Sequence, residues 1–298
     1  MTPQFASCLT GSPASAAVRV DERVIASARH TQDYRVRVLA PRQPAGAGGY
    51  PVLIMLDGDA LLPELLVHLA GEKAGHDPVL VVLVSHVAQG EAAKQARVYD
   101  YTPGLAGNPR PPDPRVSAWR NGGADAFLGF LESSIMPWVN GQYPTDTTRV
   151  TFYGHSYAAL CVLHALCTQA VSCARYVAVS PSVWWQDGAV FDAIALAAQR
   201  NLKPADVLIL AGSRESWHSH AVGADGSPAS REGGRPTLPQ ARELARALAG
   251  LSGVSVAFDA VEGGTHHTML AQSVAPALAF ARRVGPLSPS LFQEPFSS

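Results

Sequence analysis

The chain of 298 residues has little net charge, few cysteines and no long apolar run, and each shortage narrows what it can be. Its 23 Lys and Arg residues nearly balance its 24 Asp and Glu residues, which leaves a net charge of −1. So small a charge provides no strong field to draw the protein to nucleic acid or to an anionic membrane. We therefore expect neither as a partner, and any recognition of charge must be local to a pocket.

Cysteine is scarce, and the four that occur follow no zinc-binding spacing. They are Cys8, Cys161, Cys167 and Cys173. We expect free thiols, with a Cys167–Cys173 disulfide as the alternative. Nothing in this pattern requires an oxidising compartment, and the sequence predicts no metal site and no cofactor.

Membrane and export signals are also missing from the sequence as written. No stretch reaches membrane-spanning length without a helix breaker. Residues 1–20 have neither the basic start nor the continuous apolar segment of a signal peptide. The expected location is the cytoplasm, or the periplasm if a leader has been removed.

What the chain has is a regular alternation of strand-like and helix-like segments. Strands are expected at residues 18–25, 34–40, 52–57, 79–85, 150–153, 176–179, 207–211 and 254–260. Helices are expected at residues 60–70, 124–140, 158–168, 190–199, 238–248 and 269–283. The first two strands should pair antiparallel. The rest predicts an α/β fold in which helices cover both faces of a mostly parallel sheet.

We expect one domain over residues 1–298, with some segments outside its regular framework. Residues 1–17 and 286–298 are expected to be peripheral tails. The Gly-, Ser- and Pro-rich segment 216–237 is expected to be a flexible excursion. Residues 89–123 have little periodicity, and a loop of this length inside a compact domain is usually functional or mobile.

The pentapeptide Gly154-His155-Ser156-Tyr157-Ala158 lies between an expected strand and an expected helix. That context is typical of the nucleophile elbow of α/β-hydrolases, in which a serine occupies a sharp, strained turn. The usual motif is G-x-S-x-G, and Ala158 is the smallest replacement for its last glycine. We predict that Ser156 is a nucleophile; the alternative is a tight turn whose serine only caps the helix.

A nucleophilic serine needs a base and an acid, which follow it in the chain in the order acid, then histidine. His266 and His267 lie in a Gly-rich loop after the last expected strand, and only one of them can face the serine. Glu215 follows the preceding strand and is the candidate acid. Asp225 is the fallback acid, and a Ser–His pair without an acid is a further alternative.

Acyl transfer also needs donors for the oxyanion that forms at the carbonyl. One should be the N–H of Tyr157, directly after the nucleophile. The second should come from the loop after residues 52–57, at Gly58 or Asp59.

Five segments together resemble the esterase D-like siderophore esterases, which are α/β-hydrolases that cut trilactones such as enterobactin and salmochelin. The resemblance extends from about residue 34 to about residue 280. The segments are Met55-Leu56-Asp57-Gly58-Asp59, Arg97-Val98-Tyr99-Asp100-Tyr101-Thr102-Pro103, Gly122-Gly123-Ala124-Asp125-Ala126-Phe127, Gly154-His155-Ser156-Tyr157 and Ser180-Pro181-Ser182-Val183-Trp184-Trp185.

This resemblance implies roles for particular residues. It places the nucleophile at Ser156 and favours His266 over His267, and it makes Arg97 a substrate-binding residue. Trp184 and Trp185 match a pair of tryptophans in the family. The chain departs from the family by having Ala158-Ala159 where two glycines are usual and His267 where a glycine is usual.

A catecholate substrate is compatible with these side chains. Arg97 could bond catecholate oxygens, and the rings of Tyr101, Tyr157, Trp184 and Trp185 could stack on catechols. Alternatively, Arg97 pairs with Asp100, and Trp184 belongs to the core.

We therefore expect a serine esterase that hydrolyses the ester bonds of a ferric or apo catecholate siderophore, with the iron arriving on the substrate. A general carboxylesterase acting on acetyl esters, feruloyl esters or S-formylglutathione is the second hypothesis. A catalytically inactive protein that binds a ligand in the same pocket is the third.

Overall fold

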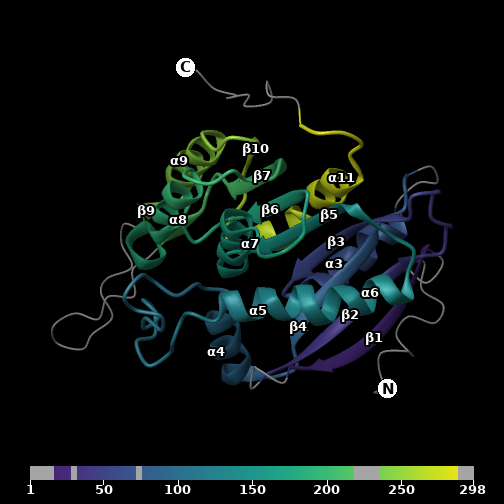
Figure 1. Cartoon of the computed structure of the whole chain (residues 1–298), viewed down its shortest axis with the longest axis horizontal. Coiled ribbons are helices and arrows are strands. Elements are labelled where there is room, and N and C mark those ends of the chain that lie inside the picture. Colours follow the sequence, from purple (N-terminus) through teal and green to yellow (C-terminus); the bar gives the residue numbers. More distant parts are fainter. Residues whose placement is uncertain (1–16, 28–31, 72–75, 218–234, 288–298) are drawn as a thin grey trace.

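The computed structural model describes residues 17–27, 32–71, 76–217 and 235–287, and an eight-stranded sheet crosses its centre (Figure 1). The strand order is β1-β2-β4-β3-β5-β6-β7-β10. β2 is antiparallel to both β1 and β4, and every other neighbouring pair is parallel. The strands are β1 (Val18–Ala26), β2 (Asp33–Pro41), β3 (Tyr50–Leu56), β4 (Leu80–His86), β5 (Thr145–His155), β6 (Arg175–Val179), β7 (Ala205–Gly212) and β10 (Val254–Val261). The predicted mostly parallel sheet, with an antiparallel pair at its start, is confirmed.

Helices cover both faces of this sheet (Figure 1). One face packs against α3 (Gly58–Gly71), α10 (Met269–Gln272) and α11 (Val274–Arg282). The other packs against α4 (Gly90–Asp100), α5 (Ala124–Phe130), α6 (Met136–Gln142), α7 (Tyr157–Thr168), α8 (Ala189–Ala197) and α9 (Leu238–Ala249). This covering explains why the central strands are apolar runs, since all seven residues of β3 are buried.

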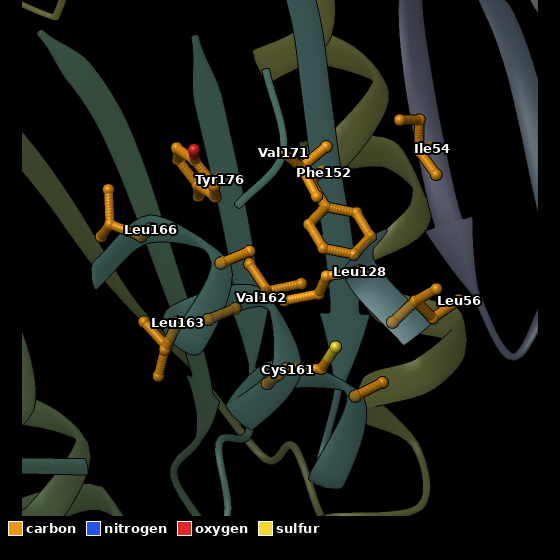
Figure 2. Close-up of a cluster of buried hydrophobic side chains, with 14 of the residues drawn as sticks. Ile54, Leu56, Leu128, Phe152, Cys161, Val162, Leu163, Leu166, Val171 and Tyr176 are labelled. Atoms are coloured by element: carbon orange, nitrogen blue, oxygen red, sulfur yellow. The ribbon is translucent and has the colours of Figure 1, made fainter. Parts of the chain in front are cut away.

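Alternating side chains of each strand enter different cores. In β3, Ile54 belongs to the core under α5–α9 and Leu53 to the core under α3 and α11. Figure 2 shows part of the first of these cores, to which Leu163 of α7, Phe152 of β5 and Tyr176 of β6 all belong. The strand that delivers the elbow and the helix that leaves it are therefore held by continuous apolar packing.

Several elements differ from the sequence-based expectations. Residues 89–123 are not loop throughout, because α4 occupies Gly90–Asp100; it buries only Ala96, Val98 and Asp100, so its apolar periodicity is weak. The helix expected over residues 124–140 contains a π-helical turn at Leu131–Ile135. The helix expected over residues 269–283 divides at Ser273, whose buried hydroxyl contacts the Tyr153 hydroxyl at 2.7 Å.

The structure describes the first two residues of the expected C-terminal tail, Pro286 and Leu287. Leu287 is buried, and its N–H donates to Asp206 Oδ1 at 3.1 Å. Leu287 thus packs on the fold, whereas Pro286 is exposed. Residues 1–16 and 288–298 lie outside the described residues.

The ends of the expected excursion form a small two-stranded sheet. β8 (Ser216–Trp217) pairs antiparallel with β9 (Arg235–Pro236). Residues 218–234, which include the fallback acid Asp225, lie outside the described residues.

The thiols of Cys161, Cys167 and Cys173 are free, so the alternative Cys167–Cys173 disulfide is wrong. Cys8 lies outside the described residues. No helix in the described ranges combines the length and apolar character needed to cross a bilayer.

Two leucines provide a matched test of the core. Leu163 in α7 is fully buried, whereas Leu196 in α8 is 63% exposed. Leu163→Ala should lower the free energy of unfolding by about 2–5 kcal/mol, because it leaves a cavity. Leu196→Ala should change it by less than about 0.5 kcal/mol, as at most surface sites. Urea denaturation of both variants measures the difference, and equal losses would contradict this packing.

Candidate active site

Ser156 lies at the turn between β5 and α7 with φ 62° and ψ −118°, a conformation that a residue with a side chain rarely adopts. Gly154 makes this turn possible, because a Cβ there would lie 2.3 Å from the carbonyl oxygen of Ala158. Ala158 itself is fully buried, so its methyl group fits between helix and sheet. The elbow thus forms with alanine in its last position.

A chain of hydrogen bonds joins the three predicted catalytic side chains. Ser156 Oγ lies 3.0 Å from Nε2 of His266, and Nδ1 of His266 lies 3.2 Å from Oε2 of Glu215. The three residues follow β5, β10 and β7, whose carboxyl ends meet at one edge of the sheet. Of the two candidate histidines, His266 is therefore the one that the fold brings to the serine.

The Glu215 carboxylate is well supported although its side chain is only 2% exposed. Oε1 accepts hydrogen bonds from Ser180 Oγ and, at 2.7 Å, from the N–H of Gly212. Burial by itself raises the pKa of Glu215, but the hydrogen bonds from His266, Ser180 and Gly212 outweigh it and leave the pKa below its ordinary value. An ionised Glu215 holds the proton of neutral His266 on Nδ1, which leaves Nε2 able to accept the serine proton.

Two glycines allow close contact between the loop after β7, which carries Glu215, and the loop after β10, which carries His266. A Cβ on Gly212 would lie 2.3 Å from the carbonyl oxygen of Gly264. The N–H of Arg214 donates to that same carbonyl at 2.9 Å, and the N–H of Gly263 donates to Ser213 Oγ at 2.9 Å. The Gly-rich sequence before His266 thus sets the distance between the base and the acid.

The two alternatives for the second oxyanion donor are no longer equal. The N–H of Asp59 donates to Ser85 Oγ at 2.8 Å, and its carboxylate pairs with Arg35 and Arg37, so the prediction for Asp59 is wrong. Gly58 remains the predicted donor. It begins α3 so close to β4 that a Cβ would lie 2.5 Å from Leu83 Cβ.

The other predicted oxyanion donor is the N–H of Tyr157, at the first position of α7. The first N–H groups of a helix have no acceptor within the helix, and they carry the positive end of its dipole.

Arg97 is bound mainly by Asp57. Its Nε and Nη2 make three hydrogen bonds of 2.7–2.9 Å to that carboxylate, and Nη2 also donates to the carbonyl of His155 at 3.1 Å. The alternative pairing with Asp100 is wrong, because Asp100 instead accepts from Tyr34 and contacts His86. Substrate binding by Arg97 stays a prediction. The hydrogen bonds to Asp57 and His155 use Nε and Nη2, so Nη1 is the group that could bind substrate.

The predicted aromatic pocket divides into buried and accessible members. Tyr101 is fully buried, and Trp185 is 2% exposed and donates from Nε1 to Asn121 Oδ1 at 3.1 Å. Their predicted stacking on substrate is wrong, since both rings belong to the core. Trp184 is half-buried, with its ring centroid 5.8 Å from that of buried Tyr157.

Two residues next to Ser156 and His266 lie in segments of the family resemblance, but the sequence predicted no role for them. Ser182 Oγ lies 3.2 Å from Ser156 Oγ. His155 Nε2 lies 3.0 Å from the carbonyl oxygen of His266, and the two rings are 4.7 Å apart. Both contacts join segments distant in the chain. In the described ranges, no three His, Cys, Asp or Glu side chains lie together as a set that could hold a metal ion.

A strained serine after a strand, followed along the chain by a carboxylate and a histidine that reach it, defines a serine hydrolase of the α/β-hydrolase class. A family model described as "Putative esterase" matches residues 27–266. The chain belongs to this esterase family and is a carboxylic-ester hydrolase.

Named relatives and solved structures are similar over most of the chain. The ferri-bacillibactin esterase of Bacillus subtilis (strain 168) is 29% identical over 270 residues, covering 87% of this chain and 88% of the relative. The apo-salmochelin esterase of Escherichia coli O6:H1 is 30% identical, covering 65% of this chain and 61% of the relative. The crystal structure of the BES protein from Bacillus cereus has a TM-score of 0.72 and 25% identity, covering 89% of this chain and 96% of that one.

His155 should make stability depend on pH. Burial, reinforced by the nearby charges of His266 and Arg97, lowers its pKa from 6.5 to about 3. Between those values the unfolded chain binds more protons, so stability falls as the pH falls. His155→Gln removes this dependence. Between pH 6.5 and about pH 4.5, the free energy of unfolding of the variant should therefore fall by about 2 kcal/mol less than that of wild type, at up to about 1.4 kcal/mol per pH unit.

The measurement is the urea midpoint of wild type and variant at the two pH values. His267→Gln, which removes an exposed imidazole from the same loop as His266, is the matched control. An identical pH dependence in wild type and His155→Gln would show that His155 does not resist protonation.

Proposed function

We propose that Ser156, His266 and Glu215 form the catalytic triad of this esterase. The observation that carries the proposal is the continuous chain of contacts from Ser156 Oγ through the imidazole to a buried carboxylate, at 3.0 and 3.2 Å. Nε2 is placed to accept the serine proton, and Glu215 stabilises the imidazolium that results.

In the proposed reaction, Ser156 Oγ bonds to the ester carbonyl carbon while its proton passes to His266 Nε2. The oxyanion accepts hydrogen bonds from the N–H groups of Tyr157 and Gly58. The tetrahedral intermediate collapses as its C–O bond breaks, and the leaving alkoxide takes the proton from His266. Water then attacks the acyl-enzyme with His266 as base, which releases the acid and restores Ser156–OH.

We propose further that the ester belongs to a catecholate siderophore. The named relatives act on ferri-bacillibactin and salmochelin, which supports a substrate of this kind. Half-buried Trp184 beside the elbow supports an aromatic substrate. Iron in this scheme is cargo on the substrate and takes no part in the acyl transfer.

Removal of the nucleophile tests the triad. Ser156→Ala should lower kcat by about 10⁴-fold or more, as in other serine triads, and should abolish labelling by a fluorophosphonate probe. Ser182→Ala removes the hydroxyl that contacts Ser156 Oγ at 3.2 Å, and it is the control for labelling because it leaves Ser156 in place. Labelling that persists in Ser156→Ala would place the nucleophile elsewhere, and an unlabelled, folded wild type would support the inactive-binder hypothesis.

Product analysis tests the substrate class. Ferric enterobactin, apo-enterobactin and p-nitrophenyl acetate should all be cleaved, with kcat/KM higher for a trilactone than for the short ester. The three catechol groups of the trilactone can make binding contacts that the single nitrophenyl group of the short ester cannot. Better turnover of the short ester, without binding of either siderophore, would favour a general carboxylesterase.

A further inference from the structure

The loop after α4 is fastened to the elbow helix by Asp113, whose side chain is fully buried. Asp113 Oδ2 accepts from the Tyr157 hydroxyl at 2.8 Å and from Asn121 Nδ2 at 3.4 Å. Its Oδ1 accepts from the N–H groups of Arg115 and Val116 at 3.0 and 3.1 Å. These bonds hold the backbone of Arg115 against the first residue of α7.

The guanidinium of Arg115 lies on the ring of Tyr157. Its Cζ is 4.1 Å from the Tyr157 ring centroid and 5.9 Å from that of Trp184. The two rings are themselves 5.8 Å apart and tilted by 41°. A cation at such distances is attracted by the electron-rich faces of aromatic rings.

The two aromatic residues that contact this cation are linked to the reacting serine. Tyr157 directly follows Ser156, and Trp184 lies two residues after Ser182, whose Oγ is 3.2 Å from Ser156 Oγ. Tyr157 is fully buried, whereas the Arg115 side chain keeps 30% of its surface exposed. Arg115 therefore presents positive charge to solvent on the ring of the residue that follows the nucleophile.

Among the described residues, the ion pair of Arg115 is loose, and its guanidinium also interacts with the Tyr157 hydroxyl. Its ion-pair contact is Nε to Asp113 Oδ1 at 3.7 Å, beyond hydrogen-bonding distance, and that oxygen already accepts two backbone N–H groups. Arg97 provides the contrast, since Asp57 holds it through three hydrogen bonds of 2.7–2.9 Å. Of these two arginines, Arg115 has the more donors available for a ligand.

We propose that Arg115, held on Tyr157 and flanked by Trp184, is a specificity-determining residue that binds a negatively charged aryl group of the substrate. The guanidinium donates hydrogen bonds to the anionic oxygens of the aryl group. The half-buried ring of Trp184 packs against the ring of the aryl group. This inference rests on the proposed function, because it identifies the recognition element for a catecholate ester.

The test compares Arg115→Met with wild type on ferric enterobactin, which is anionic, and on p-nitrophenyl acetate, which is neutral. The variant should raise KM for ferric enterobactin and reduce the ratio of the two kcat/KM values by about tenfold to hundredfold, the range for one charge-assisted hydrogen bond. Arg115→Lys keeps the charge without the planar fork, so it should recover part of the ratio.

Arg110→Met is the matched control. Arg110 belongs to the same loop and also stacks on a tyrosine, with its Cζ 5.4 Å from the Tyr99 ring centroid. Because Tyr99 lies in α4 and not in the elbow, Arg110→Met should leave the substrate ratio as in wild type. A fall of the ratio in Arg110→Met equal to that in Arg115→Met would overturn the assignment.

A second readout separates this inference from the proposed substrate. Inhibition of p-nitrophenyl acetate hydrolysis by 2,3-dihydroxybenzoate should weaken about tenfold or more in Arg115→Met, while inhibition by uncharged benzamide changes less. A wild type that cleaves the short ester but no trilactone contradicts the siderophore proposal. Equal weakening for both inhibitors, or an unchanged substrate ratio, contradicts the role of Arg115 and indicates that it only braces the loop.

Discussion

Glu215 places a carboxylate where only 2% of its side chain reaches solvent, and a buried charge of this kind is tolerated only when its oxygens are hydrogen-bonded. The partners come from four places in the fold. They are the N–H of Gly212 at the end of β7, Ser180 after β6, His266 after β10 and Thr237 before α9. Meeting the needs of this one carboxylate therefore fixes the loops that surround the serine.

A second ion pair, which is half-buried, connects the opposite side of the elbow. Asp57 follows β3, Arg97 lies in the last turn of α4, and Arg97 also donates to the carbonyl just before Ser156. The strained serine thus lies between two charge-assisted networks. Strain of this kind persists only where the surroundings hold the backbone firmly, and here they do so from both sides.

The sequence could predict the elbow, His266 and Glu215 because each follows an expected strand, and parallel strands bring their carboxyl ends to one edge. The partner of Arg97 and the burial of Tyr101 and Trp185 could not be predicted in this way. Those properties depend on which segments meet in space, and an aromatic side chain near a motif fits a pocket or a core equally well. Helix α4 was missed for a related reason, since only three of its eleven residues are buried.

The pairing of β8 with β9 has a consequence for how this fold can vary. Ser216 is adjacent to the acid, and Pro236 is adjacent to Thr237, whose N–H donates to the Glu215 carbonyl at 3.2 Å. The two described ends of this connection are therefore held side by side. Because the entropy of closing a loop grows only slowly with its length, insertions or deletions between these strands carry a small thermodynamic cost for the acid. The length of the chain at this point is free to diverge while the chemistry stays in place.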